Sequence, residues 1–209
     1  WTSDGQGSPT SLGHGLGVTP DFLIIKNRTG SSGNWQCWSP TFSNATNDFI
    51  SLNLSDGKQT AGAAMWGTMN STVVNFRHSA NSSNGNTMVG YFFSNVEGFS
   101  KAGSYVGNGS TNGTFVLTGF RPAWIMVKKT SGGENWQLRD STREPNNVTD
   151  LRLEANLSTA EGGQTNGDRL DILSNGFKGR DGAGQFNENN ANYIYLAFAE
   201  NPFKYARAR

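Results

Sequence analysis

Several acidic residues in the second half of the chain are the first candidates for chemistry, because glycosidases use two carboxyl groups about 5–9 Å apart. These residues are Glu134, Asp140, Glu144, Glu154, Glu161 and Glu200. Their spacing singles out no pair, and Glu97 and Glu200 both follow similar apolar segments, which indicates a repeated structural role. The sequence also contains no nucleophile elbow, phosphate loop or zinc motif. We therefore expect no enzyme activity, no catalytic residue and no cofactor.

Metal and thiol chemistry is also not favoured by the sequence. His14 and His78 are too far apart to form a local ligand pair. The run Asp181–Asn187 is similar to a calcium loop, but Ala183 interrupts the alternation of oxygen ligands that such a loop needs. A single cysteine, Cys37, excludes an internal disulfide and a thiolate-rich zinc site. We expect Cys37 to be a small buried apolar residue and expect no metal site.

The chain contains an internal repeat, which sets where every candidate residue must lie. Four segments of the first half match segments of the second half in the same order. They are Thr19–Lys26 with Arg121–Lys128, Asn34–Gln36 with Asn135–Gln137, Asn53–Ser55 with Asn156–Ser158, and Thr87–Phe93 with Asn192–Phe198. The sequence therefore predicts two domains, residues 1–102 and 103–209.

Within each half the apolar residues alternate with period two or form short runs, which is the pattern of β-strands. Phe22–Lys26 and Trp124–Lys129 read as buried strands, and Phe49–Leu54 as a strand with one inward face. No segment sustains the spacing of an amphipathic helix. We predict an all-β fold of two tandem β-sandwich repeats of jelly-roll or lectin-like type. The alternative is one larger concanavalin A-like sandwich made from both halves, since Gly103 and Gly107 could form a linker or hairpin turns.

The tryptophans divide into matched and unmatched positions. Trp35 and Trp136 share an Asn-Trp-Gln element, which indicates core packing. Trp38 aligns with Arg139, and Trp66 has no clear counterpart. A ring of this kind, when exposed, is a surface on which a sugar ring can stack. Trp38 and Trp66 are therefore the candidate ligand-binding residues.

The amino-acid composition argues against nucleic acids and membranes as partners. The 209 residues carry a net charge of +1, so the basic surface expected of a nucleic-acid-binding protein is lacking. No apolar run reaches the length of about 18 residues that a transmembrane helix needs. Charged residues make up only 16%, and Gly, Asn, Ser and Thr replace them. Because the chain begins at Trp1 and has no signal segment, we expect it to be a piece of a longer protein.

Three segments of the second half, Tyr193–Arg209, Thr118–Ile125 and Leu173–Lys178, resemble the C-terminal repeat of virion fibre and appendage proteins of tailed bacteriophages. Gly13–Asp21 is similar to the start of the preceding unit in those proteins. The resemblance implies a lectin-like β-sandwich at the surface of a virus particle, as a fibre tip, a receptor binder or a capsid decoration. It supplies no catalytic residue. The first unit lacks a full leading strand before Gly5, which suggests that a missing N-terminal part anchors the protein to the particle.

These observations lead to one functional expectation and two alternatives. We expect a non-enzymatic bacteriophage surface protein that contacts host cell-surface glycans, binds other virion proteins and forms a homo-oligomer, which the fibre resemblance implies to be a trimer. The first alternative is a purely structural virion component whose only ligands are neighbouring subunits. The second is a polysaccharide-degrading enzyme. Nucleic-acid binding and membrane insertion are not expected.

Overall fold

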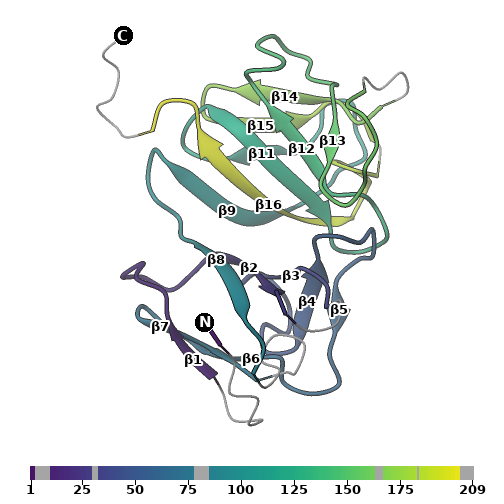
Figure 1. The fold of residues 1–209 in the computed structure, drawn as a ribbon. Coiled ribbons are helices and arrows are strands. Elements are labelled where there is room, and N and C mark those ends of the chain that lie inside the picture. The colour runs from purple at the N-terminus through teal and green to yellow at the C-terminus, as the bar shows by residue number, and fades with distance from the viewer. Residues whose placement is uncertain (3–9, 30–32, 78–84, 163–166, 183, 203–209) are drawn as a thin grey trace. The chain divides into compact units, whose positions relative to one another are not determined.

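The computed structural model describes residues 1–2, 10–29, 33–77, 85–162, 167–182 and 184–202. Every regular element in these ranges is a β-strand, and every strand pairing is antiparallel, so the predicted all-β class is confirmed. The chain divides into two compact units, Trp1–Ser94 and Asn95–Arg209 (Figure 1). Among the described residues there is no helix with the length and hydropathy to cross a bilayer.

Unit 1 contains a five-stranded sheet and a three-stranded sheet. The five-stranded sheet has the order β5-β4-β3-β2-β8 and the three-stranded sheet the order β1-β7-β6. The strands are β1 (Thr10–Gly13), β2 (Phe22–Asn27), β3 (Gln36–Trp38), β4 (Asp48–Ser51), β5 (Gln59–Thr60), β6 (Trp66–Met69), β7 (Val73–Phe76) and β8 (Met88–Phe93).

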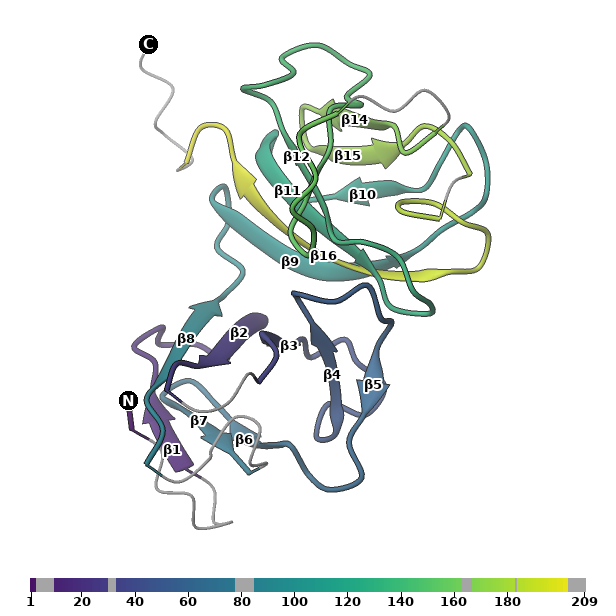
Figure 2. The same ribbon diagram turned by 45° about the vertical axis from the view of Figure 1, so that its right-hand side comes forward.

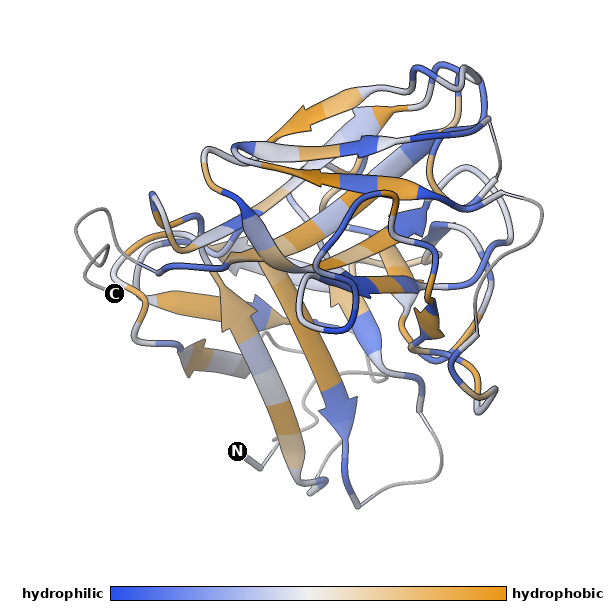
Figure 3. Ribbon diagram, turned by 90° about the horizontal axis from the view of Figure 1, so that it is seen from above, coloured by the Kyte–Doolittle hydropathy of each residue, from blue (hydrophilic) through white to orange (hydrophobic). Residues whose placement is uncertain are grey.

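The interior of unit 1 follows from the alternation of side chains along these strands. Leu23 and Ile25 of β2 are buried, as are Trp66 of β6 and Phe76 of β7. The Trp66 and Phe76 rings meet edge to face with their centroids 6.2 Å apart. Apolar residues, orange in Figure 3, gather in the strands, as the period-two pattern predicts. Both sheets of unit 1 therefore contribute buried apolar side chains.

Unit 2, like unit 1, contains one five-stranded and one three-stranded sheet. Its five-stranded sheet has the order β13-β12-β11-β16-β9, and its three-stranded sheet the order β10-β15-β14. The strands are β9 (Ser100–Val106), β10 (Phe115–Leu117), β11 (Pro122–Lys129), β12 (Gln137–Asp140), β13 (Leu153–Glu154), β14 (Leu170–Leu173), β15 (Gly176–Gly179) and β16 (Asn192–Ala199). One apolar cluster joins residues of both sheets, among them Val127, Ile172, Phe177 and Tyr195.

The repeat seen in the sequence reappears in strand order and hydrogen bonding. The order β4-β3-β2-β8 in unit 1 corresponds to β13-β12-β11-β16 in unit 2, and β1-β7-β6 corresponds to β10-β15-β14. In unit 1 the Trp35 main-chain N–H donates to Asn53 Oδ1 at 2.8 Å. In unit 2 the Trp136 N–H donates to Asn156 Oδ1 at 2.9 Å. The matched Asn-Trp-Gln and Asn-Leu-Ser segments are thus held together by the same bond in both units.

The division between the units lies between Ser94 and Asn95, whereas the sequence places the domain boundary after residue 102. Residues 102 and 103 lie inside β9, where Gly103 pairs with Tyr195 of β16. A Cβ at Gly103 would meet Tyr195 Cε1 and Oη at 3.1 Å, so a larger residue would have to displace the ring by a few tenths of an ångström. Gly103 is therefore a strand residue in close contact with Tyr195, and not part of a linker.

Candidate ligand-binding site

The two tryptophans selected from the sequence lie in the interior of unit 1. Trp38 of β3 is 5% exposed, and its Nε1–H donates to the Ala45 carbonyl at 2.7 Å. Trp66 is fully buried, and its Nε1–H donates to the Asp48 carbonyl at 2.8 Å. A sugar stacks only on an accessible ring face, and these rings present none. The structure therefore assigns Trp38 and Trp66 to packing, with their single polar atoms satisfied.

Asp48, whose carbonyl accepts the hydrogen bond from Trp66, is held in place by a buried polar cluster. The Asp48 carboxylate is buried, accepts hydrogen bonds from Thr60 Oγ1 at 2.6 Å and Asn44 N–H at 3.0 Å, and pairs with the Lys58 ammonium. Burial opposes ionisation of Asp48, but the hydrogen bonds from Lys58, Thr60 and Asn44 outweigh it and hold its pKa below the ordinary value. The ionised carboxylate thus fixes the β4–β5 edge beside Trp66.

A different pair of aromatic residues lies at the surface of unit 1. Trp35, one residue before β3, is half-buried, and Tyr91 of β8 is 48% exposed. Their rings are stacked with centroids 6.4 Å apart and planes 23° apart. They line a pocket of about 530 Å³, which lies within the range of about 300–1,000 Å³ for small-molecule sites. The pocket is lined by Lys26, Asn27, Arg28, Trp35, Val89 and Tyr91.

Strand register brings the pocket residues together. Lys26 of β2 pairs with Val89 of β8, and Ile24 pairs with Tyr91. Side chains two residues apart share a face, so Val89 and Tyr91 both project on the side of the sheet opposite to Leu23 and Ile25. The Asn53 side chain fixes the Trp35 main chain by the bond already described and donates to Asn34 Oδ1 at 2.9 Å. The aromatic platform is therefore placed by paired strands and by a side-chain clamp.

The polar part of the pocket is cationic. The Lys26 ammonium donates to the Gly33 carbonyl, and Arg28 is exposed. Asn27 is buried, and its Oδ1 accepts the Thr29 N–H at 3.1 Å. None of the described residues that line the pocket carries a carboxylate. The arrangement can accept a flat apolar ring face on the aromatic pair while offering charged donors to hydroxyl or acidic groups beside it.

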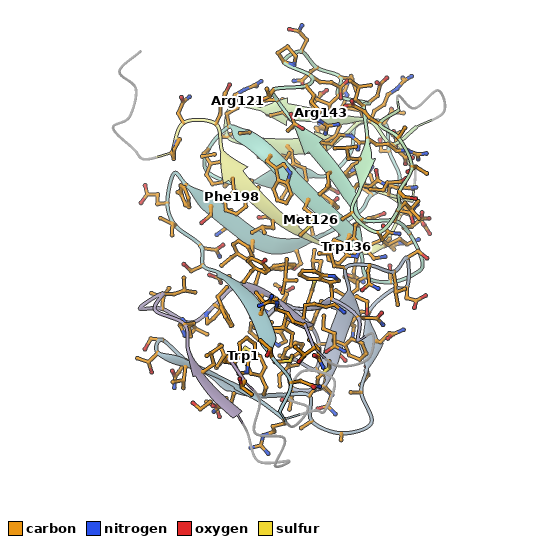
Figure 4. All side chains as sticks on the ribbon, viewed as in Figure 1. Trp1, Arg121, Met126, Trp136, Arg143 and Phe198 are labelled. Carbon is orange, nitrogen blue, oxygen red and sulfur yellow. The ribbon has the colours of Figure 1, made fainter. Side chains whose placement is uncertain are left out.

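Sequence reasoning placed Trp35 in the core with Trp136, and the two differ in the structure. Trp136, one residue before β12, is 1% exposed and is labelled near Met126 of β11 in Figure 4. Trp35 is half-buried. The signal for the site lies at the matched position of the neighbouring strand, where Tyr91 in the first half replaces Leu196 in the second. An amphipathic tyrosine in place of a buried leucine marks a face that meets water.

Five of the six carboxylates considered for glycoside hydrolysis hold loops and strand ends of unit 2. Glu144 accepts the main-chain N–H groups of Asp150 at 3.0 Å and Leu151 at 2.7 Å. Glu200 pairs with Arg121 at 2.9 Å. Arg143 bridges two more of them, Asp140 and Glu161. Glu154 accepts from Asn135 Nδ2 at 2.9 Å.

The candidate metal ligands are engaged within the protein or lie outside the described residues. His14 Nε2 lies 3.0 Å from the Asn70 carbonyl, whereas His78 and Ala183 are outside the described residues. In the Asp181–Asn187 run, the Asn187 amide is buried, and its Nδ2 lies 2.9 Å from the Asp181 carbonyl. In the part of the chain that the structure describes, no three His, Cys, Asp or Glu residues are grouped to hold a metal ion.

Unit 2 also buries an arginine where unit 1 has Trp38. Arg139 is fully buried, donates from Nη2 to the Asp168 carbonyl at 2.8 Å, and places Cζ 5.0 Å from the centre of the Phe186 ring. Burial lowers the pKa of Arg139 to about 10. Burial, with a smaller contribution from Asp181, raises the pKa of Asp168 to about 6. Asp168 Oδ1 is buried without a hydrogen-bond partner, which is costly for a carboxylate.

Residues 1–202 match the family model described as Domain of unknown function (DUF7483). No curated protein and no solved structure matches the chain.

Proposed function

We propose that this chain, which belongs to the family described as Domain of unknown function (DUF7483), is a non-enzymatic surface protein of a bacteriophage particle. It is built from two tandem β-sandwich repeats and binds a host cell-surface glycan through the pocket that Trp35 and Tyr91 line. The observation that carries the proposal is this stacked, solvent-facing aromatic pair with two cations beside it.

The tandem-sandwich part of the proposal is supported by the architecture of each unit. Each unit has one three-stranded and one five-stranded antiparallel sheet with corresponding strand orders. In unit 2 a single apolar cluster contains residues of both sheets, as expected when two sheets pack face to face. Each sheet is formed inside one unit, which favours two small sandwiches over one large one made from both halves.

The glycan part is supported by the chemistry of the pocket. The C–H face of a pyranose is apolar and packs against an aromatic ring, while its edge presents hydroxyl groups. Trp35 and Tyr91 supply the rings, and Lys26 and Arg28 supply donors at their side. Because no carboxylate lines the described pocket, we expect acidic sugars to bind more tightly than neutral sugars of the same size.

The particle-surface part rests on the resemblance of the second half to bacteriophage fibre and appendage repeats. In that setting other virion proteins are the structural partners, and a homo-oligomer, a trimer by the same resemblance, would cover exposed sheet edges. The sedimentation mass of the purified chain tests the oligomer directly. A mass of three copies would support the trimer. A mass of one copy over the whole range of protein concentrations measured would refute it.

The pocket is tested by binding to an array of bacterial lipopolysaccharide and capsular saccharides, with acidic and neutral members. We expect binding without release of oligosaccharide. Trp35→Ala and Tyr91→Ala should each weaken binding at least tenfold, about 1.4 kcal/mol. Phe115→Ala is the matched control, because Phe115 is also an exposed aromatic residue on a strand but does not line the pocket.

Three outcomes would contradict the proposal. Absence of binding to every saccharide would favour a purely structural component. Release of oligosaccharide would show an enzyme. Equal affinity of the wild type, Trp35→Ala and Tyr91→Ala for a bound saccharide would place the site elsewhere. Circular dichroism of each variant checks that a loss of binding does not come from unfolding.

A further inference from the structure

The outer edges of the two five-stranded sheets differ. In unit 2 the edge of β16 is covered by β9, with pairs from Asn192 with Val106 to Phe198 with Ser100. In unit 1 the corresponding strand is β8, which pairs with β2 on one side (Figure 2). On its other side the described residues provide only Trp1 and Thr2.

Trp1 takes the place in unit 1 that Tyr105 of β9 has in unit 2. The Trp1 ring stacks on Phe76 with centroids 5.3 Å apart, and the Tyr105 ring meets Phe177 edge to face at 5.9 Å. Phe76 and Phe177 are matched residues of the repeat, on β7 and β15. Trp1 is labelled on unit 1 in Figure 4. The start of the described chain therefore corresponds to the end of β9.

The hydrogen bonds of Trp1 fix the direction and register of this edge. The Met88 N–H donates to the Trp1 carbonyl at 2.8 Å, and the Trp1 amino group donates to the Met88 carbonyl at 3.2 Å. This is a hydrogen-bonded antiparallel pair, in the position of Tyr105 opposite Tyr193. Continued toward its amino side, such a strand would lie opposite Val89 and then Gly90.

The main-chain N–H and C=O groups of β8 that such a strand would pair with point away from β2. The Asp21 N–H donates to the Phe93 carbonyl at 2.8 Å, so Phe93 directs its main chain toward β2. Successive residues of a strand direct their main-chain groups to opposite sides, which turns those of Gly90 and Phe92 toward the outer edge. Among the described residues, neither Gly90 nor Phe92 makes a hydrogen bond on that side.

We propose that the edge of β8 from Gly90 to Phe92 accepts an antiparallel strand joined to the amino side of Trp1, as β9 covers β16 in unit 2. In such a strand, the residue two positions before Trp1 would lie opposite Gly90, and the residue four positions before it would lie opposite Phe92. The occupant has the chemistry of β9, with small and polar residues along Ser100–Ser104. Strand addition of this kind derives its affinity from main-chain hydrogen bonds.

The test extends the chain with the strand that the second unit uses. The sequence Ser-Lys-Ala-Gly-Ser, that of residues 100–104, is fused directly before Trp1. Amide hydrogen exchange at single residues is then measured by NMR with and without the extension. We expect exchange at Gly90 and Phe92 to slow at least tenfold, and the Tm of unit 1 to rise. Exchange at Ile24, whose strand β2 is already paired on both sides, should not change.

A matched control carries proline in place of the glycine of the extension. Proline removes the N–H that would donate to the Gly90 carbonyl and does not fit inside a paired strand, so the extension should fail to pair and the Gly90 amide should lose its protection. Three results would overturn the proposal. They are unchanged exchange at Gly90 and Phe92 in the fused protein, equal protection with the proline extension, or strong protection of both amides in the unextended chain.

Discussion

Replacing Asp168 by asparagine should remove a loss of folding stability that unit 2 undergoes as the pH rises. The Asp168 carboxylate is buried beside the Arg139–Phe186 contact, one oxygen has no hydrogen-bond partner, and the residue has a φ of 63°. Asparagine keeps the shape, tolerates this left-handed conformation, and cannot ionise. The Arg139 bond is to the main-chain carbonyl of Asp168, so the substitution leaves it in place.

The size and sign of the effect follow from the pKa. The folded-state pKa of about 6 lies above the ordinary value of 3.8, so the folded protein binds the proton more tightly than the unfolded chain. Stability from this group is therefore complete below about pH 4 and is lost as pH rises through about 6. At about 1.4 kcal/mol for each pH unit, the gap sets a ceiling of about 3 kcal/mol. Solvent screening of a partly accessible carboxylate reduces this to an expected 1–2 kcal/mol, roughly.

The measurement is the free energy of opening of β11 and β16, from hydrogen-exchange mass spectrometry between pH 5 and pH 7.5. Wild type should lose stability across this range, whereas Asp168→Asn should be flatter and should be the more stable of the two at pH 7.5. Asp48 does not interfere, because its pKa is lowered and its contribution is lost only below about pH 4. A parallel decline in both proteins, or a less stable variant at pH 7.5, would refute the reasoning.

Two further predictions concern buried polar and thiol groups. Asn187→Ala removes the acceptor for the Asn108 and Thr114 N–H groups and the side-chain amide that donates to the Asp181 carbonyl. The free energy of unfolding of unit 2, measured by urea titration, should therefore fall by about 3–5 kcal/mol. A loss below about 1 kcal/mol would mean that water replaces the amide. Burial raises the pKa of the Cys37 thiol well above its usual range, so the native protein should resist iodoacetamide at pH 8 and react once unfolded in guanidinium. Labelling of the native protein at the rate of a free thiol peptide would contradict the burial of Cys37.

The class of fold and its repetition could be predicted from the residues alone. Short apolar runs such as Phe22–Lys26 form buried strands because their side chains meet apolar neighbours. The matched Asn-Trp-Gln segments indicated a repeated local structure. The equivalent Asn53–Trp35 and Asn156–Trp136 hydrogen bonds hold that structure in the two units. Cys37, on a strand beside apolar residues, was predicted to be buried and is buried.

The identity of the surface aromatic residues was decided by tertiary structure. Trp38 looked exposed because it has no matched aromatic residue, yet it pairs with Leu23 in the register of β2 and β3, and both are buried. Trp35 looked buried because Trp136 matches it, yet it stands half-buried beside Tyr91. Local pattern determines which residues alternate along a strand. Which face meets water depends on the order of strands and on what packs over each face, and those are set by segments distant in the chain.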